Sequence, residues 1–157
     1  MKPKRYLLTV DEDDQEVFIL AIHSDVEDFQ LAFQINKNSN SRFQRSKKDI
    51  HDVHRQAVFS RYFWDNHNLE VQFHLISNKQ FIEKKSAVAN SNTLFDLPVR
   101  NEVSLFSEFK QVDFFIISND YQSLNGLLET LKSLAVVSMV YPVALEQFKN
   151  RSQLIFD

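Results

Sequence analysis

Two carboxylates flank the start of an apolar run in the last third of the chain. Glu108 stands five positions before Asp113, and the apolar stretch Phe114–Ile117 follows directly. Paired carboxylates perform acid–base catalysis when their surroundings push their pKa values apart. In an extended chain, however, five positions at about 3.3 Å each separate two residues by about 16 Å. We therefore interpret both acids as anchors at the entry of a strand, and keep an enzyme that uses them as acid and base as a distant alternative.

A second constellation is the segment DIHDVH, residues 49–54, which holds two acids and two histidines. On a helix His51 and His54 would lie three positions apart on one side, where two imidazoles can bind one metal ion. The spacing supplies no third ligand, and the bases that flank the segment oppose a cation. We therefore predict neither a metal site nor a cofactor.

Cations alternate with aromatic side chains along residues 42–64, as in proteins that bind single-stranded nucleic acid. In such proteins bases stack on rings and phosphates pair with Lys or Arg. The candidate cations are Arg42, Arg45, Lys47, Lys48, Arg55 and Arg61. The whole chain has a net charge of −3, so it has no general field that attracts a polyanion. An RNA-associated protein is therefore an alternative hypothesis and not the favoured one.

Composition excludes several classes of site. The 157 residues contain no Cys, which rules out disulfides, thiolate metal sites and Cys nucleophiles and fits a cytoplasmic protein. Phosphate-cradling loops need several glycines, whereas this chain has only Gly126, inside a Leu-rich segment. We expect asparagines at the predicted breaks, such as Asn66 and Asn78, to serve the turns instead. No apolar stretch approaches the roughly 20 residues that a membrane-spanning helix needs, so we expect no membrane association.

Alternating polarity and turn residues predict strands and one helix in the first half of the chain. Tyr6–Val10 and Glu16–His23 are predicted strands joined across the acidic turn DEDDQ. Asp25 is the predicted cap of a helix. One stripe of this helix carries Phe29, Ala32, Phe33 and Asn36, with Leu31 and Ile35 beside it. Residues 57–64 and 69–77 flank the turn DNHN, the strongest hairpin pattern in the chain.

The second half contains the most regular patterns. Residues 79–104 lack periodicity and are predicted to form a long loop of the mobile or functional kind. Gln111–Ser118 is apolar on both faces, which is typical of a central strand. A Leu-rich helix capped by Asn119 or Asp120 follows, and Val136–Val143 returns as a strand, which makes a βαβ unit.

These elements predict one α+β domain over residues 1–157. We expect a mostly antiparallel sheet of five or six strands, two or three helices and a C-terminal βαβ unit. The last of the helices is the short segment Ala144–Asn150, with the LIF sequence of the tail docking behind it.

The segment FSEFKQVDF, residues 106–114, resembles the signature of the IPExxxVDY family, an uncharacterised bacterial family known mainly from the Bacteroidetes. The matching residues are Glu108, Val112 and Asp113, with the three-residue spacer kept. The replacements are Phe106 for Ile, Ser107 for Pro and Phe114 for Tyr. The predicted order of elements is similar over nearly the whole chain. The family has no agreed activity, so the resemblance implies a fold and a structural motif and assigns no catalytic residue.

We therefore expect a small cytoplasmic protein that binds another protein, as an adaptor does, and is not an enzyme. Its partner would contact the surface around the motif or residues 79–104. The motif residues Glu108, Val112, Asp113 and Phe114 are assigned a structural role. The identity of the partner and the oligomeric state do not follow from the residues.

Overall fold

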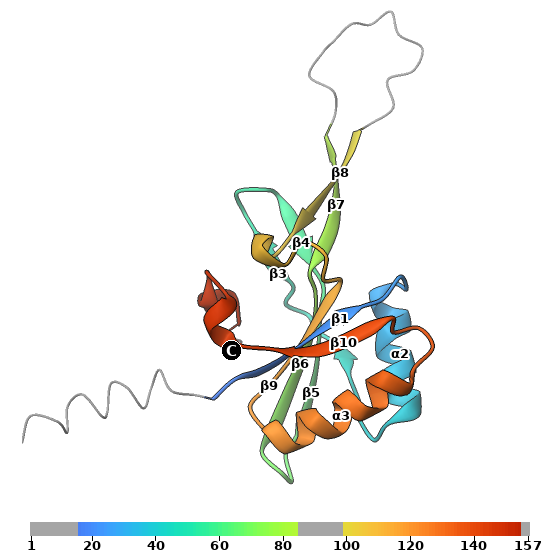
Figure 1. The fold of residues 1–157 in the computed structure, drawn as a ribbon. Helices are drawn as coiled ribbons and strands as arrows, with labels where there is room; N and C mark the ends of the chain where they lie inside the picture. Colours follow the sequence, from blue (N-terminus) through green and yellow to red (C-terminus); the bar gives the residue numbers. More distant parts are fainter. Residues whose placement is uncertain (1–15, 85–98, 155–157) are drawn as a thin grey trace, which may run out of the picture.

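The computed structural model describes residues 16–84 and 99–154 (Figure 1). The predicted strand Tyr6–Val10 lies outside the described residues. Within them, the main sheet has six strands in the order β10-β1-β9-β6-β5-β2, and every neighbouring pair is antiparallel. The bounds of its strands are β1 Phe18–His23, β2 Gln44–Arg45, β5 Arg61–Asn66, β6 Val71–Ser77, β9 Phe114–Ser118 and β10 Met139–Val143. The predicted α+β class and sheet size are confirmed.

Strand β9 is central, as its pattern predicted, and all five of its residues are buried. Phe114 and Ile116 face the core under the two helices, whereas Phe115 and Ile117 face a second core on the other side of the sheet. A strand covered on both faces must be apolar on both, which explains why this run does not alternate.

The C-terminal βαβ unit is confirmed, with another strand inserted between its two strands. β9 and β10 both pair antiparallel with β1, so they run parallel to each other on either side of it. Helix α3, Tyr121–Ser133, connects them, and the side chain of its N-cap Asp120 accepts a hydrogen bond from the Ser123 N–H at 2.9 Å. Its buried face consists of Leu124, Leu127, Leu128 and Leu131.

Helix α2, Asp28–Asn38, buries a different stripe from the predicted one. Its N-cap is Glu27, which forms a capping box with Gln30, and Asp25 lies before the helix. Leu31, Ala32 and Ile35 are the buried residues. Phe29 and Phe33 of the first stripe are 59% and 54% exposed, so the helix packs inward through the neighbouring Leu31 and Ile35.

Four further strands form an arm that extends the β5–β6 hairpin beyond the main sheet (Figure 1). Only Ser60 separates β5 from β4, and only Asn78 separates β6 from β7. The four strands of this arm are β3 Ile50–Asp52, β4 Ala57–Phe59, β7 Lys79–Lys84 and β8 Val99–Ser104. β3 pairs with β4 and β7 pairs with β8, in both cases antiparallel.

The prediction of a loop over residues 79–104 is therefore wrong at both ends of the segment, where β7 and β8 pair as a hairpin. Residues 85–98, between these strands, lie outside the described residues. The sequences KQFIEK and VRNEVS are largely polar. For this reason they lack the apolar alternation that marks a strand.

A cluster of phenylalanine rings fills the core on the side of the sheet away from the helices. Phe106 and Phe148 lie 4.8 Å apart between ring centroids, and Phe115 lies 5.5 Å from Phe106 in an edge-to-face arrangement. Short 3-10 turns cover this side; their bounds are η1 Ser107–Phe109, η2 Leu145–Gln147 and η3 Arg151–Leu154. The predicted helix Ala144–Asn150 is thus a single 3-10 turn, and Leu154 of the tail is buried as expected.

The buried side chain of Asn78 holds the turn between the arm and β9. Asn78 is 0% exposed. Its Nδ2 donates to the carbonyl oxygens of Phe109 and Val112 at 2.8 Å each, and its Oδ1 accepts from the Phe106 N–H at 3.0 Å. Its own peptide groups bond to the Leu105 N–H and the Asp113 carbonyl. Five hydrogen bonds therefore converge on this one buried residue.

Replacing Asn78 with alanine should destabilise the protein by about 3 kcal/mol, because two buried backbone groups and one partly buried group lose their partner, at about 1–3 kcal/mol for each buried group. The matched control is Asn119→Ala. Asn119 is exposed and bridges the Gln72 N–H and the Glu70 carbonyl, which water can satisfy in its place, so we expect a loss below about 1 kcal/mol. Urea unfolding of the two variants measures the difference. Equal losses would contradict the assigned role of Asn78.

His74 lies in β6, between Phe63 of β5 and Ile117 of β9. Burial and, to a smaller extent, the nearby Arg61 lower its pKa from 6.5 to about 4, and Asp65 partly opposes the shift. The folded chain therefore keeps His74 neutral at a pH where the unfolded chain protonates its histidines. Stability linked to His74 is complete above about pH 6.5 and is lost as the pH falls from there toward about 4.

Acidification from pH 7 to about 4.5 should lower the free energy of unfolding by about 2 kcal/mol through His74 alone. His74→Gln, which cannot titrate, should remove this part of the pH dependence. His67→Gln, at a histidine that is 86% exposed, should leave it unchanged. Urea unfolding at the two pH values measures the difference. The assignment fails if His74→Gln and wild type lose stability equally on acidification.

Candidate functional site

The two acids of the motif anchor different parts of the chain. Asp113 accepts a hydrogen bond from the Ser24 N–H at 2.8 Å through Oδ2, and its Oδ1 forms an ion pair with Lys79 Nζ at 3.1 Å. Glu108 instead accepts a hydrogen bond from the Lys149 N–H at 2.8 Å, near the C-terminus. Each carboxylate therefore has its own partners, as expected for structural anchors.

The apolar motif residues lie in both cores. Val112 is 2% exposed and belongs to the core on the phenylalanine side. Phe114 is 6% exposed and belongs to the core under the helices. The motif therefore crosses from one core to the other at the start of β9, and Asn78 holds the turn before it.

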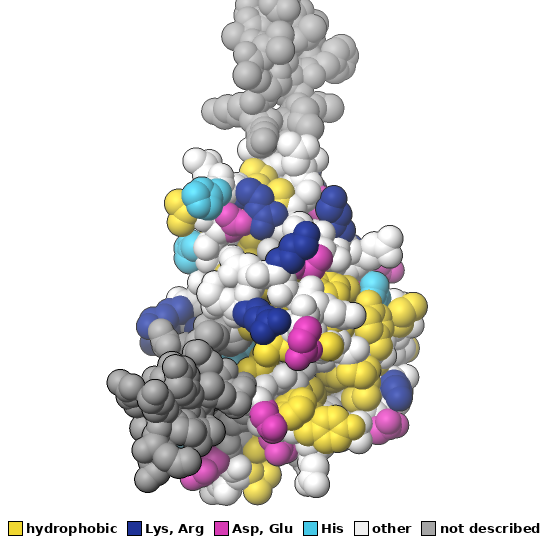
Figure 2. Space-filling model, turned by 60° about the vertical axis from the view of Figure 1, so that its left-hand side comes forward, with side chains coloured by type: hydrophobic (Ala, Val, Ile, Leu, Met, Phe, Trp, Pro, Cys, Tyr) yellow, Lys and Arg dark blue, Asp and Glu magenta, His cyan; other side chains and the backbone are white. Residues whose placement is uncertain are grey.

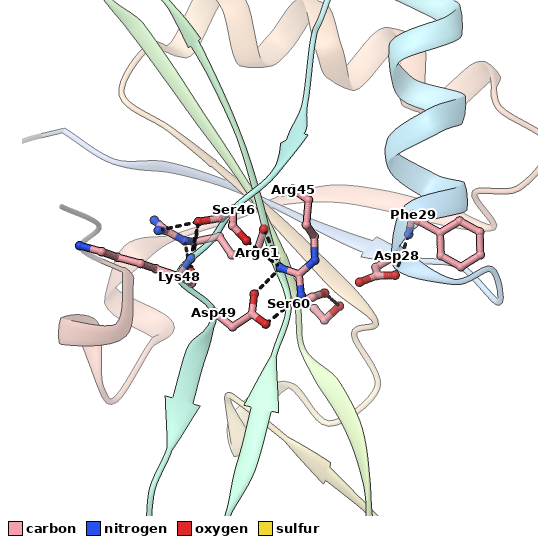
Figure 3. Close-up of polar contacts among 9 residues, drawn as sticks. Asp28, Phe29, Arg45, Ser46, Lys48, Asp49, Ser60 and Arg61 are labelled. Carbon is pink, nitrogen blue, oxygen red and sulfur yellow. Dashed lines mark hydrogen bonds and ion pairs between the residues drawn. The ribbon is translucent and has the colours of Figure 1, made fainter.

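The cations predicted to bind nucleic acid do not form one exposed group, because some of them bind groups within the chain. Arg61 is 8% exposed, and its guanidinium donates to the Lys48 carbonyl and the Ser46 hydroxyl at 3.0 Å each (Figure 3). Arg45 pairs with Asp49 through two hydrogen bonds, which raise the pKa of the arginine and lower that of the aspartate.

Among the remaining cations, Arg55 also binds groups within the chain. Arg55 pairs with Asp52, with 2.6 Å between Nε and Oδ2, and donates to the Ser104 carbonyl. The exposed members of the predicted set are Arg42, Arg45, Lys47 and Lys48, and of these Arg45 is paired with Asp49. On the face shown in Figure 2, basic and acidic side chains lie interspersed.

The DIHDVH segment forms strand β3 and the turn after it, so the helical spacing of His51 and His54 does not arise. Within residues 16–84 and 99–154 no group of three or more His, Asp or Glu side chains lies close enough to hold a metal ion. In the same residues no helix is long and apolar enough to cross a membrane.

A groove of about 900 Å³ opens between the start of α2 and the arm, and we call it the arm groove. Six carboxylates, three bases and three serines contribute to its lining. The residues on which its chemistry depends are Asp28, Arg45, Ser60, Lys79, Phe81, Arg100 and Asp113. In Figure 3, Arg45, Asp49 and Ser60 form one side of this region, and Asp28 faces them from α2. Asp113 of the motif thus belongs to the groove.

The arm contributes an exposed aromatic and cationic wall. Phe81 is 52% exposed, and the Arg100 guanidinium lies 4.8 Å from the centre of its ring, in the arrangement of a cation–π contact. Lys79 lies between two carboxylates, at 3.1 Å from Asp113 and 3.8 Å from Glu102. The lining therefore offers aromatic, cationic and anionic contacts side by side, which suits a polypeptide segment of mixed chemistry.

Sequence reasoning missed the contribution of the arm to this groove. Lys79, Phe81 and Arg100 lie in the stretch predicted as a loop, and no local pattern indicated that they pair across a hairpin. Asn78 was read only as a break between elements. The one available signal was Asp113 at the entry of a buried strand, because a carboxylate there needs polar partners.

Comparisons of the chain with protein-family models, with curated proteins and with solved structures found no match.

Because the two acids of the motif have separate partners, the stability losses of Glu108→Ala and Asp113→Ala should add in the double variant to within about 0.5 kcal/mol. We expect each single change to cost about 1–2 kcal/mol through the lost charged hydrogen bond. The cycle of Asp113→Ala with Lys79→Ala is the positive control and should show coupling of at least about 0.5 kcal/mol. Urea unfolding gives all the values. Coupling between Glu108 and Asp113 as large as in the control would restore a shared two-carboxylate site.

Proposed function

We propose that the chain is a cytoplasmic, non-enzymatic binding or adaptor protein of the IPExxxVDY type, and that a partner protein occupies the arm groove. The observation that carries this proposal is the exposed Phe81–Arg100 pair, which stands over a groove of about 900 Å³ that the motif acid Asp113 helps to line. Aromatic side chains and arginine are the types that contribute most at protein interfaces.

The contacts of Asp113 support a link between the motif and binding. Its carboxylate bonds the loop before α2 at Ser24 and also pairs with Lys79 of β7. These two segments belong to opposite walls of the groove, so one carboxylate fixes the spacing between them. A motif that sets the geometry of a binding surface can be shared by proteins that carry out no common reaction.

A protein partner accounts for the chain better than RNA does. Three of the six candidate cations, Arg45, Arg55 and Arg61, already bind groups within the chain. Carboxylates also outnumber bases in the lining of the arm groove, which opposes a phosphate backbone. The same lining accepts a segment that brings its own Lys or Arg together with an apolar side chain.

The proposal predicts a partner whose capture depends on Phe81. Wild-type protein, Phe81→Ser and Val53→Ser are immobilised and exposed to extracts of the cells in which the chain occurs. Val53 is the matched control, because it is an apolar side chain of the arm region, 81% exposed, outside the lining of the groove. We expect the same protein to be retained by wild type and Val53→Ser and lost with Phe81→Ser, because truncating a central aromatic anchor costs 2 kcal/mol or more, about a 30-fold loss in affinity.

The retained protein is then purified, and its binding to the three variants is measured directly by calorimetry. No retention above background by wild type would refute the binding function. Equal retention by all three would keep a partner but remove it from the arm groove.

A further inference from the structure

A second hollow, of about 410 Å³, lies between the C-terminal end of α2, the β5–β6 turn and helix α3. We call it the Trp64 pocket. None of the residues that line it is charged, which sets it apart from the arm groove. Its volume lies within the range of small-molecule sites in proteins. The two hollows share no lining residue, so a ligand in the Trp64 pocket and a protein partner in the arm groove would contact different residues.

One wall of the pocket is aromatic and held in place. The ring of Trp64 stacks on Phe73 at 4.8 Å between centroids, with the planes only 13° apart. Phe43 meets Trp64 edge-on at 6.2 Å. These contacts hold the indole without burying it completely. A fixed aromatic surface of this kind can receive the apolar face of a ligand with little loss of conformational entropy.

The other walls carry neutral groups that both donate and accept hydrogen bonds. Three asparagines line the pocket, namely Asn38, Asn40 and Asn66. Helix α3 adds the hydroxyls of Ser123 and Thr130. Asn38 donates to the Gln34 carbonyl, whereas the carboxamides of Asn40 and Asn66 form no hydrogen bond with any other described residue. These two amides are therefore available to a ligand, each with two donors and one acceptor oxygen.

The glycine of the chain also lines this pocket. Gly126 lies inside α3, where glycine lowers helix stability relative to alanine. Its φ is not positive, and a Cβ added there would meet nothing within 4 Å. Neither the backbone nor the packing of the chain therefore requires glycine at this position. The absence of a side chain does leave room in the wall of the pocket.

We propose that the Trp64 pocket binds a neutral saccharide unit. A sugar ring has one face of C–H groups, which suits the indole of Trp64, and a rim of hydroxyls that both donate and accept, which suits the amides of Asn40 and Asn66. A charged ligand would lose its hydration in a lining that offers no counter-charge. Gly126 allows the ring to approach the backbone of α3.

Trp64 is the only tryptophan of the chain, so tryptophan fluorescence, excited selectively over that of the four tyrosines, reports on this pocket. The full-length protein is titrated with maltotriose, cellobiose and N,N′-diacetylchitobiose. We expect a saturable change of Trp64 fluorescence with at least one of them, with a dissociation constant in the millimolar range or tighter. Glucuronic acid and adenosine serve as the charged and the nucleoside comparison, and we expect neither to give this change.

Two substitutions separate binding from stability. Gly126→Ala should raise the urea midpoint, because alanine favours the helix and no clash opposes it. The same change should weaken saccharide binding about tenfold or more, because the added methyl group occupies the ligand's space. Asn125→Ala is the control on the same helix, since Asn125 is exposed and lines a different hollow, and it should bind as wild type does.

Four results would overturn the proposal. The first is that none of the three saccharides changes the fluorescence of Trp64 in a saturable way. The second is that Gly126→Ala binds as tightly as wild type. The third is that glucuronic acid or adenosine binds as well as the saccharides do. The fourth is that Asn125→Ala loses binding to the same extent as Gly126→Ala, which would make the effect one of helix α3 in general.

Discussion

The buried carboxamide of Asn78 is the constraint on which the motif and the arm both depend. Asn78 lies between β6 and β7, where the chain passes from the main sheet into the arm. The hydrogen bonds of its side chain hold the turn of residues 105–113 at this position. A buried amide is tolerated only when all its polar atoms have partners, so the turn can adopt only the conformation that supplies them. Asp113 follows directly on this turn, and its position between Ser24 and Lys79 is fixed in consequence.

The phenylalanine-rich composition follows from a sheet that is covered on both faces. The helices bury one face of the sheet. The other face is covered by short 3-10 turns and the motif turn, which contain little regular secondary structure. Large rigid rings such as Phe106 and Phe148 fill that irregular layer with few residues. The scarcity of glycine has a different consequence. Among the residues that the structure describes, positive φ angles fall on Gln56 and Glu70, near 50°, and not on the asparagines that the sequence suggested for turns.

Sequence patterns predicted the parts of the fold that local physics determines. The central strand β9 and the Leu-rich helix α3 formed within the predicted segments. The β5–β6 hairpin also formed, but its turn lies at residues 67–70, two positions after the predicted one, and Ser60 divides the predicted strand 57–64 into β4 and β5. The β7–β8 hairpin of the arm was missed because its sequences KQFIEK and VRNEVS are largely polar and lack the alternation that marks a strand. For the motif, spacing alone was enough to separate the roles of Glu108 and Asp113. Their partners Lys149 and Lys79 could not be predicted, because both come from segments more than 30 positions away.

Asn78 and Gly126 are both residues of a type that is unfavourable at its position in the fold. A buried asparagine is unfavourable by itself, but five hydrogen bonds within the chain compensate for it, so its role is structural. A glycine inside a helix is also unfavourable, and here no contact within the chain compensates for it. Sequences depart from local preference chiefly where function demands it. An uncompensated departure that faces an aromatic, uncharged pocket therefore points outside the chain, toward a ligand.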